Sequence, residues 1–296
     1  MRVRPAEDTD AEPVTAILRE VDDARVLSAA GWVHGRHGAP AARRLLHLVA
    51  TDGDQIVGFG ASGLDIWTTA AAGWCNVAVT ATRRREGIGG ALLEALLEHL
   101  RDIGATKATS FIRFSDEGER WASARGWSRV LTGPLIAVDP RTVPHVPLPD
   151  GYRSGSMLDA GPEAVYGAVV DAARDEPRPD PIENMPYDEF VSDWSQPDID
   201  LEASTVAYAD DLVVAFTEIR IAGDRAQHGF TGTRREYRGR GLASAVKAIA
   251  LGAAAARGVT RVTTSNAEEN AAMRAVNRKL GFEQIGEHVI VGRELG

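Results

Sequence analysis

The chain has 296 residues, of which 44% are hydrophobic and 25% are charged, and its formal net charge is −9. This length allows two domains of ordinary size, each with its own hydrophobic core. The acidic balance argues against a general nucleic-acid-binding protein. No apolar run has the length of a signal-peptide core or a membrane span, and a single cysteine excludes an internal disulfide framework. We therefore expect a cytoplasmic protein that does not associate with membranes.

In the first half of the chain, strands alternate with helices. We expect a strand at 1–4, an amphipathic helix at 10–20, a helix at 41–47, and strands at 47–51 and 55–62 joined by an Asp-Gly turn. A strand at 73–80, a helix at 87–103, a strand at 108–112, a helix ending at 124 and a hairpin at 127–138 follow. Mixed strands and helices in this order predict an α/β (α+β) architecture.

A proline-rich stretch at 142–150 contains no periodicity and predicts a linker. We therefore expect an N-terminal domain at 1–141 and a C-terminal domain at 151–296. The second domain begins with a strand at 152–157, helices at 162–174 and 187–195, and strands at 204–209 and 211–221. A strand at 225–233, an Ala-rich helix at 242–256 and a strand at 259–265 come next.

The stretch from His228 to Lys247 combines the end of a strand, a basic turn with glycines, and the start of a helix. Free backbone N–H groups at a helix N-terminus bind phosphate, and glycine permits both the sharp turn and a close approach of the anion. Arginines at 234, 235, 238 and 240 add positive charge there. The stretch is neither a Walker loop nor the dinucleotide fingerprint. Its ordinary alternative is an exposed basic turn that caps a helix.

The same element occurs earlier, in the stretch from Trp74 to Leu93, with Arg84 lying 154 positions before Arg238. Neighbouring segments correspond at nearly the same spacing, because Arg125-Gly126-Trp127 matches Leu280-Gly281-Phe282 at 155 positions. The chain is therefore a duplication of one α/β unit, and the repeat is too long for a solenoid.

Arg238, Gly241 and Ala243 fit the pattern R-x-x-G-x-A, and Asn266, Asn270, Met273 and Asn277 precede Gly281-Phe282. These motifs resemble the GNAT superfamily of N-acetyltransferases, in tandem form and distantly like mycothiol synthase. The resemblance implies two mixed, splayed sheets flanked by helices, acetyl-CoA as co-substrate, and no metal. It places the acetyl-CoA contacts on Phe230, Thr231, Thr233, Arg238, Gly239, Arg240, Gly241, Leu242, Ala243, Asn266 and Asn270 in the second half, and on Arg84, Arg85, Gly87 and Gly89 in the first.

The implied reaction is direct attack of a neutral amine on the acetyl thioester. Glu218 and His228 are the candidates that take the amine proton, directly or through water, although a salt-bridged glutamate or a structural histidine fits the sequence equally. The family's usual tyrosine acid is replaced by Asn277 in the second half and by Ala122 in the first. Asn277 is therefore a candidate for orienting water or ligand, and Asn270 is a candidate for either CoA contact or helix capping.

The second half retains more of the motifs, so we expect catalysis there and only a binding or structural role in the first half. Eleven Asp and Glu residues between 171 and 202 predict a cationic small-molecule amine as acceptor, with a solvated acidic face as the alternative. Cys75 has no neighbouring His or Asp and is expected to be structural. A non-catalytic acyl-CoA sensor and a mycothiol-synthase-like enzyme remain alternatives, and the protein is expected to be a monomer or homodimer.

Overall fold

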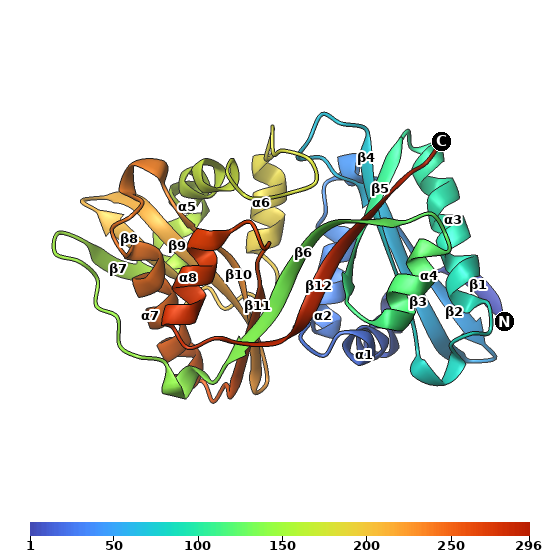
Figure 1. The fold of residues 1–296 in the computed structure, drawn as a ribbon, viewed down its shortest axis with the longest axis horizontal. Helices are drawn as coiled ribbons and strands as arrows, with labels where there is room; N and C mark the ends of the chain where they lie inside the picture. The colour runs from blue at the N-terminus through green and yellow to red at the C-terminus, as the bar shows by residue number, and fades with distance from the viewer. The chain divides into compact units, whose positions relative to one another are not determined.

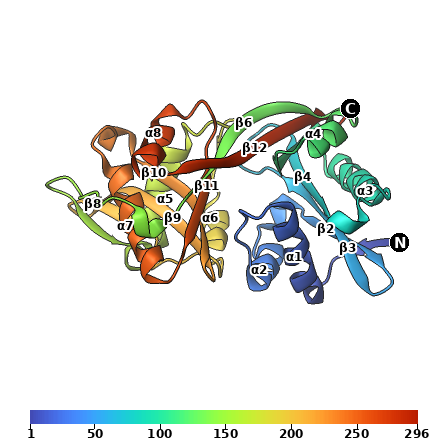
Figure 2. The same cartoon turned by 60° about the horizontal axis from the view of Figure 1, so that its bottom comes forward.

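The computed structural model describes residues 1–296, which form two compact units. The first unit comprises Met1–Thr132 with Glu287–Gly296, and the second comprises Gly133–Gly286. Each unit contains a mixed sheet with helices on both faces (Figures 1 and 2). The expected fold class, two similar α/β units with splayed sheets, is confirmed. None of the helices combines the length and the apolar composition needed to cross a lipid bilayer.

The sheet of the first unit has the strand order β1-β2-β3-β4-β5-β12. Its strands are antiparallel except for the central pair of β4 and β5, which is parallel. One face of the sheet packs on α1 and α2, and the other packs on α3 and α4 (Figure 1). The elements are β1 (Arg2–Pro5), α1 (Ala11–Val21), α2 (Ala29–His37), β2 (Leu46–Asp52), β3 (Gln55–Leu64), β4 (Ala72–Val79), α3 (Ile88–Asp102), β5 (Lys107–Arg113), α4 (Asp116–Ser123) and β12 (Glu283–Glu294).

The second unit repeats this plan with the strand order β6-β11-β10-β9-β8-β7, and its parallel pair is β10 and β11. Helices α5 and α7 both pack on β9, from opposite faces of the sheet (Figure 2). The elements are β6 (Ser128–Val138), β7 (Arg153–Ser156), α5 (Met157–Ala173), α6 (Tyr187–Trp194), β8 (Thr205–Ala209), β9 (Leu212–Ala222), β10 (Arg225–Thr233), α7 (Leu242–Ala256), β11 (Arg261–Ser265) and α8 (Ala271–Lys279).

The two units exchange one strand each. The edge strand beside β5 of the first unit is the C-terminal part of β12, with Val289 paired to Ile112. The edge strand beside β11 of the second unit is the end of β6, with Val138 paired to Val262. The compact units therefore differ from the consecutive domains expected at 1–141 and 151–296, and the proline-rich stretch at 142–150 lies inside the second unit.

Two expected elements are wrong. The helix expected at 41–47 is a short 3-10 turn, Ala41–Arg43, and the helix in this region is α2, whose start is capped by the Ser28 hydroxyl. The sequence did not predict α2 because three glycines lie in and after it, and glycine is a poor helix former. The hairpin expected at 127–138 is one long strand, β6, which needs no turn because its end pairs in the second unit.

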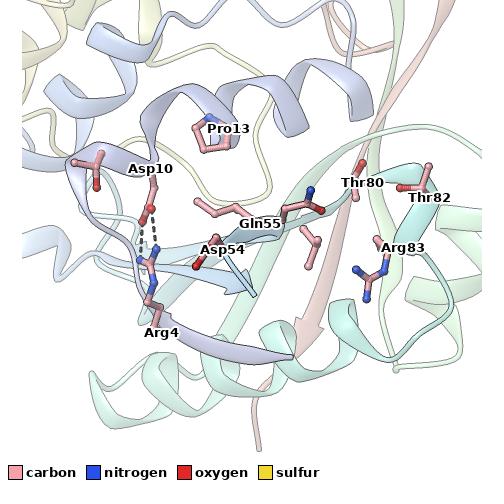
Figure 3. Close-up of a pocket in the computed structure, with 11 residues that line it drawn as sticks. Arg4, Asp10, Pro13, Asp54, Gln55, Thr80, Thr82 and Arg83 are labelled. Atoms are coloured by element: carbon pink, nitrogen blue, oxygen red, sulfur yellow. Dashed lines mark hydrogen bonds and ion pairs between the residues drawn. The ribbon is translucent and has the colours of Figure 1, made fainter. Parts of the chain in front are cut away.

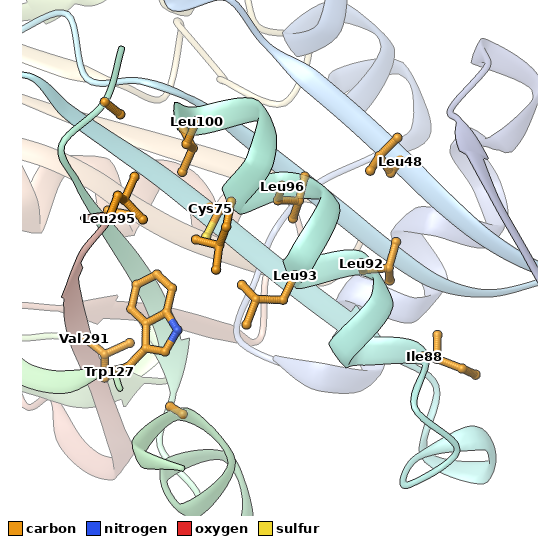
Figure 4. Close-up of a cluster of buried hydrophobic side chains, with 14 of the residues drawn as sticks. Leu48, Cys75, Ile88, Leu92, Leu93, Leu96, Leu100, Trp127, Val291 and Leu295 are labelled. Atoms are coloured by element: carbon orange, nitrogen blue, oxygen red, sulfur yellow. The ribbon is translucent and has the colours of Figure 1, made fainter. Parts of the chain in front are cut away.

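Leucines on one face of α3 form the core of the first unit. Leu92, Leu96 and Leu100 are completely buried, since residues four apart share a face of a helix. Figure 4 shows these side chains aligned along the sheet-facing side of the helix, with Leu93 near Trp127. Burial of each leucine side chain stabilises the fold by roughly 1.5–3 kcal/mol. This apolar packing fixes the helix whose N-terminus follows the basic turn.

Candidate active site

In both units the central parallel strands separate soon after they pair. β4 pairs with β5 over three residue pairs, and β10 pairs with β11 over three. In the second unit, residues 228–233 of β10 have no strand partner on the side of β11, and unpaired backbone groups need other partners. The Thr264 hydroxyl supplies one, donating to the His228 carbonyl at 3.5 Å. The rest of this edge, which includes Phe230, Thr231 and Thr233, can pair with an extended ligand.

A β-bulge interrupts β10 in the second unit but not the corresponding strand in the first. The register between β9 and β10 shifts between His228 and Thr231, whereas β3 and β4 pair without a shift. Bulges redirect backbone groups and are frequent beside active sites. A Cβ atom at Gly229 would lie 2.3 Å from the Glu218 carboxylate. A side chain at this position would therefore displace the Glu218 carboxylate, which lies directly against the bulge.

Glu218 and His228 lie on opposite faces of the sheet. His228 is opposite Ile219 in the register, and successive residues of a strand alternate between the faces. Glu218 therefore faces α5, where its carboxylate accepts a hydrogen bond from Arg220 Nε at 2.9 Å. Its side chain retains 18% exposure. Both candidate bases are next to the bulge, but only Glu218 lies on the face of the sheet that α5 covers.

His228 is enclosed between the sheet and α7. It is 3% exposed, and its Nδ1 lies 3.3 Å from the Thr217 hydroxyl and 3.3 Å from the Glu218 carbonyl. Burial, followed by the positive charge of Lys247, lowers the pKa of His228 well below its usual value. The imidazole is therefore neutral at physiological pH. Its Nε2 is buried and has no hydrogen-bond partner.

The basic turn before α7 has the geometry of an anion site. Gly239 and Gly241 have φ angles of 76° and 83°, a conformation that side-chain-bearing residues rarely adopt. Gly241 is the N-cap of α7 and provides no side chain to satisfy the first N–H groups of the helix. Nothing lies within 4 Å of the position that a Cβ atom would occupy at either glycine. Leu242 and Ala243 thus begin a helix whose N-terminus is open to a phosphate.

The turn before α3 has the same shape, but an arginine occupies one glycine position. Gly87 caps α3 with φ 86°, and Arg85 adopts φ 68° at the position that corresponds to Gly239. Arg84 Nε donates to the Val79 carbonyl, as Arg238 Nε donates to the Thr233 carbonyl in the second unit. The predicted duplication therefore extends to individual hydrogen bonds of the loop.

The arginines of the second loop are held by acidic side chains of α5 and the segment after it. Asp175 accepts hydrogen bonds from Arg235 at 2.6 and 2.9 Å and from Arg238 at 2.6 Å. These hydrogen bonds, from Arg235 first, lower the pKa of Asp175 to about 2. Arg240 donates to the Tyr152 hydroxyl at 2.8 Å. Asp175 therefore compensates the charge of the loop and is not free to attract a cationic acceptor.

The three candidate asparagines lie at the end of β11 and along α8. Asn266 follows β11, Asn270 precedes α8, and Asn277 lies within α8. Asn270 caps α8, because its side chain accepts from the Met273 N–H at 3.1 Å. Asn277 is 1% exposed and donates through Nδ2 to the Asn266 side chain at 2.5 Å. The Asn277 Oδ1 atom is buried without a partner. This atom is an unfilled acceptor in the interior of the second unit.

Lys247 is a buried residue that the sequence motifs did not single out. It lies on α7, is 1% exposed, and its ammonium nitrogen is 5.4 Å from the centre of the Phe282 ring. Burial lowers its pKa to about 7. The repeat offers a signal that finds it, because the position 154 residues earlier is Leu93, a core leucine. A lysine that replaces a core leucine requires an explanation.

The first unit contains a cavity of about 500 Å³ beside its loop. Arg4 pairs with Asp10 on one side of it, and Arg83 lies on the other (Figure 3). Arg83 itself pairs with Asp52 and Glu86, so both arginines beside the cavity are paired with carboxylates.

Cys75 is buried in the core of the first unit (Figure 4). Burial raises the pKa of its thiol to about 12, as expected for a structural cysteine. No group of three or more His, Cys, Asp or Glu side chains in residues 1–296 is arranged to hold a metal ion.

Comparison with known proteins identifies the fold of both units. The model of the acetyltransferase (GNAT) domain matches residues 43–124, and that of the acetyltransferase (GNAT) family matches residues 168–282. A tandem GNAT protein from the clavulanic acid biosynthesis pathway is 24% identical, with a TM-score of 0.74 over 100% of this chain and 98% of that one. A GCN5-related N-acetyltransferase from Sphaerobacter thermophilus is 20% identical, with a TM-score of 0.73 over 99% and 95%. A search of curated proteins found no match.

One matched domain lies in each half of the chain, and both carry the open helix N-terminus and the separated parallel strands. The chain therefore belongs to the GNAT acetyltransferases and carries two GNAT domains in tandem. Transfer of an acetyl group from an acyl-CoA donor is the general chemistry of these domains.

Proposed function

We propose that the protein is an acetyl-CoA-dependent N-acetyltransferase that modifies the primary amine of a small cationic acceptor, and that the second unit is catalytic. The bulge at Gly229–Phe230 carries the proposal. It occurs in the second unit, beside the separated strands, with the Glu218 carboxylate against it. A backbone N–H turned out of the ladder at this point is suited to stabilise the negative charge that develops on the thioester oxygen.

Each part of the second unit has a role in this proposal. The N-terminus of α7 and the loop from Arg238 to Gly241 hold the diphosphate of acetyl-CoA, and the open edge of β10 pairs with its pantetheine arm. Glu218 takes the proton of the attacking amine, directly or through water. Asn277 remains a candidate for contact with the ligand. His228 is buried and neutral, and its role in this proposal is to pack against the strand on the α7 side.

Acidic groups support a cationic acceptor, although Asp175 is not among them. Glu218, Asp193 and Asp198 surround Arg220 and raise its pKa, with Glu218 contributing most. Glu176, in the segment after α5, is exposed. These carboxylates lie on or next to the helices of the α5 face, where Arg220 balances one negative charge and the excess of carboxylates creates a negative field. An amino sugar, an aminoglycoside or a polyamine fits this field.

The first unit is proposed to be a degenerate copy that retains its loop but not its chemistry. It has no bulge in β4, and its separated strands are bridged by the side chains of Ser110 and Asn76 at 3.0 Å. Its loop keeps Arg84, Gly87 and Gly89, so weak binding of acetyl-CoA there is compatible with the proposal.

The experiment measures thiol release from acetyl-CoA in the presence of amino sugars, aminoglycosides and polyamines, with the matching alcohols as controls. The proposal expects thiol release that depends on the amine, together with an N-acetylated product identified by mass. Tight binding of CoA without turnover of any amine would instead identify a CoA-binding sensor.

A further inference from the structure

Three polar side chains of the second unit, those of His228, Lys247 and Asn277, are buried near Phe282, and two of them have a buried atom without a hydrogen-bond partner. The His228 ring centre is 6.3 Å from that of Phe282, the Lys247 nitrogen is 5.4 Å from the same ring, and the backbone carbonyl of Asn277 accepts the Phe282 N–H at 3.1 Å. His228 Nε2 and Asn277 Oδ1 are both buried without partners. No Asp or Glu forms a salt bridge with Lys247. Buried polar atoms without partners are uncommon in native proteins, and each calls for an explanation such as a functional role or a bound water.

The first unit shows that the fold does not need these polar groups. The positions that correspond to Lys247, Asn277 and Phe282 are Leu93, Ala122 and Trp127, and all three belong to its apolar core. Figure 4 shows Leu93 and Trp127 packed on the same side of α3. The same architecture is therefore built with apolar residues in one unit and with costly polar residues in the other. A function in the second unit accounts for that difference.

Lys247 and His228, the residue directly before the bulge, both lie near the Phe282 ring, on the side of the sheet opposite Glu218. After burial, the positive charge of Lys247 is the next cause of the lowered pKa of His228. The face of the bulge toward α7 therefore carries a potential proton donor, and the face toward α5 carries the carboxylate. The tyrosine that donates a proton in many GNAT enzymes is absent here, since Asn277 occupies its position.

We propose that Lys247 is the catalytic acid that protonates the sulfur of CoA as the thiol leaves, a role that rests on the acetyl transfer proposed above. The amine nitrogen forms a bond to the acetyl carbon, the carbon–sulfur bond breaks, and its electron pair remains on sulfur. A proton passes from the Lys247 ammonium to that sulfur and produces the free thiol. The proton that the amine loses to Glu218 or water balances the proton that Lys247 gives.

The ionisation of Lys247 suits this role. Burial lowers its pKa to about 7, whereas an ordinary thiol has a pKa of about 8.5, so proton transfer from the ammonium to the thiolate is favourable. His228 is the titratable side chain that faces Lys247, and it is already neutral at this pH. The other polar side chains of the cluster, Thr217 on β9 and Asn277 on α8, do not titrate.

The closing experiment compares binding of CoA with binding of desulfo-CoA, which lacks the sulfur, by calorimetry at a pH of about 6.5, where the lysine is mostly charged. The protein and its Lys247→Leu variant are compared, with Lys279→Met, an exposed lysine on α8, as the matched control. An ammonium in contact with the sulfur makes a charge-assisted hydrogen bond, so the protein and the control should bind CoA about tenfold more tightly than desulfo-CoA. The Lys247→Leu variant should bind both ligands equally, with its affinity for desulfo-CoA unchanged.

The kinetic readout is the pH profile of turnover. The protein should lose kcat as pH rises through about 7, and Lys247→Leu should be about 10²-fold slower without that dependence and with an unchanged KM for acetyl-CoA. A preference for CoA that persists in the Lys247→Leu variant overturns the role of Lys247 while the CoA site stands. Failure of the unmodified protein to bind CoA overturns the proposed function, and the role of Lys247 with it.

Discussion

The two units share one scaffold and differ at the point where chemistry would occur. In the first, β4 is regular and the helix above it contributes only apolar side chains to the core. In the second, β10 is bulged, a glutamate lies against the bulge, and Lys247 and Asn277 replace core residues. The loops before α3 and α7 are nearly identical in shape. The anion loop is therefore a feature of both units, whereas the bulge and the buried polar groups distinguish the second unit, which we propose to be catalytic.

The strongest test of this comparison introduces the same substitution into both loops. Gly87 and Gly241 have φ angles of 86° and 83°, so Glu is equally strained at either position. At Gly241 the new carboxylate would also repel the diphosphate, and like-charge repulsion of several kcal/mol predicts a loss of turnover of about 10³-fold. Gly87→Glu should leave turnover within about threefold. The reverse pattern in a thiol-release assay would assign catalysis to the first unit.

The second test removes the carboxylate that lies against the bulge. Glu218→Gln keeps the shape of the side chain but cannot accept a proton, so kcat should fall by about 10²-fold. Glu202→Gln, at an exposed carboxylate of the same unit, is the control and should leave kcat unchanged. Equal kcat values for the Glu218→Gln variant and the unmodified protein would show that another group is the base.

The third test makes the second unit resemble the first by replacing Lys247 with leucine. The pKa of Lys247 is lowered from 10.5 to about 7 in the folded protein, so between these values the unfolded chain binds more protons and stability rises with pH. Removal of the lysine should therefore raise the free energy of unfolding by on the order of 3–5 kcal/mol at neutral pH.

That gain should shrink as pH approaches 10.5, where lysine is neutral in both states. Thermal melts of the protein and the Lys247→Leu variant at a pH of about 7 and at a pH of about 10 would measure the difference. A loss of stability at neutral pH, or a gain that does not depend on pH, would contradict the buried and uncompensated state of the lysine.

The smallest expected effect concerns Asp175, which pairs with Arg235 and Arg238. Asp175→Asn should free both guanidinium groups for the diphosphate, lower the KM for acetyl-CoA about threefold, and steepen its salt dependence. The acceptor KM should not change. Because the pKa of Asp175 is about 2, the effect should be constant from about pH 5 to about pH 9. A change in the acceptor KM would show that Asp175 contributes to acceptor binding.

The loop, the duplication and the fold class could be predicted from sequence, because each depends on local features. Glycines at 239 and 241, the arginines and the repeat at 154 positions are visible in the chain itself. The role of Asp175 could not be predicted, since a run of acids does not reveal which side chain meets an arginine 60 residues away. The acidic run at 171–202 predicts an acceptor surface, whereas Asp175, one of its members, instead pairs with the arginines of the loop before α7.

The exchanged strands and the buried lysine were also outside the reach of sequence patterns. Strand β12 has the same alternating composition whether it pairs with β5 or within its own half, because pairing depends on tertiary context. Lys247 lies in an Ala-rich helix, where a single lysine is normally a solvent-exposed residue. Only the alignment with Leu93 indicates its burial.

Titration of acetyl-CoA into the protein and into its Gly87→Glu and Gly241→Glu variants tests the central claim, that the second unit holds the catalytic donor site, most directly. The account predicts a tight binding event that Gly87→Glu retains and Gly241→Glu abolishes, with any second, weaker event assigned to the first unit. A tight event that survives Gly241→Glu and disappears in Gly87→Glu would contradict it.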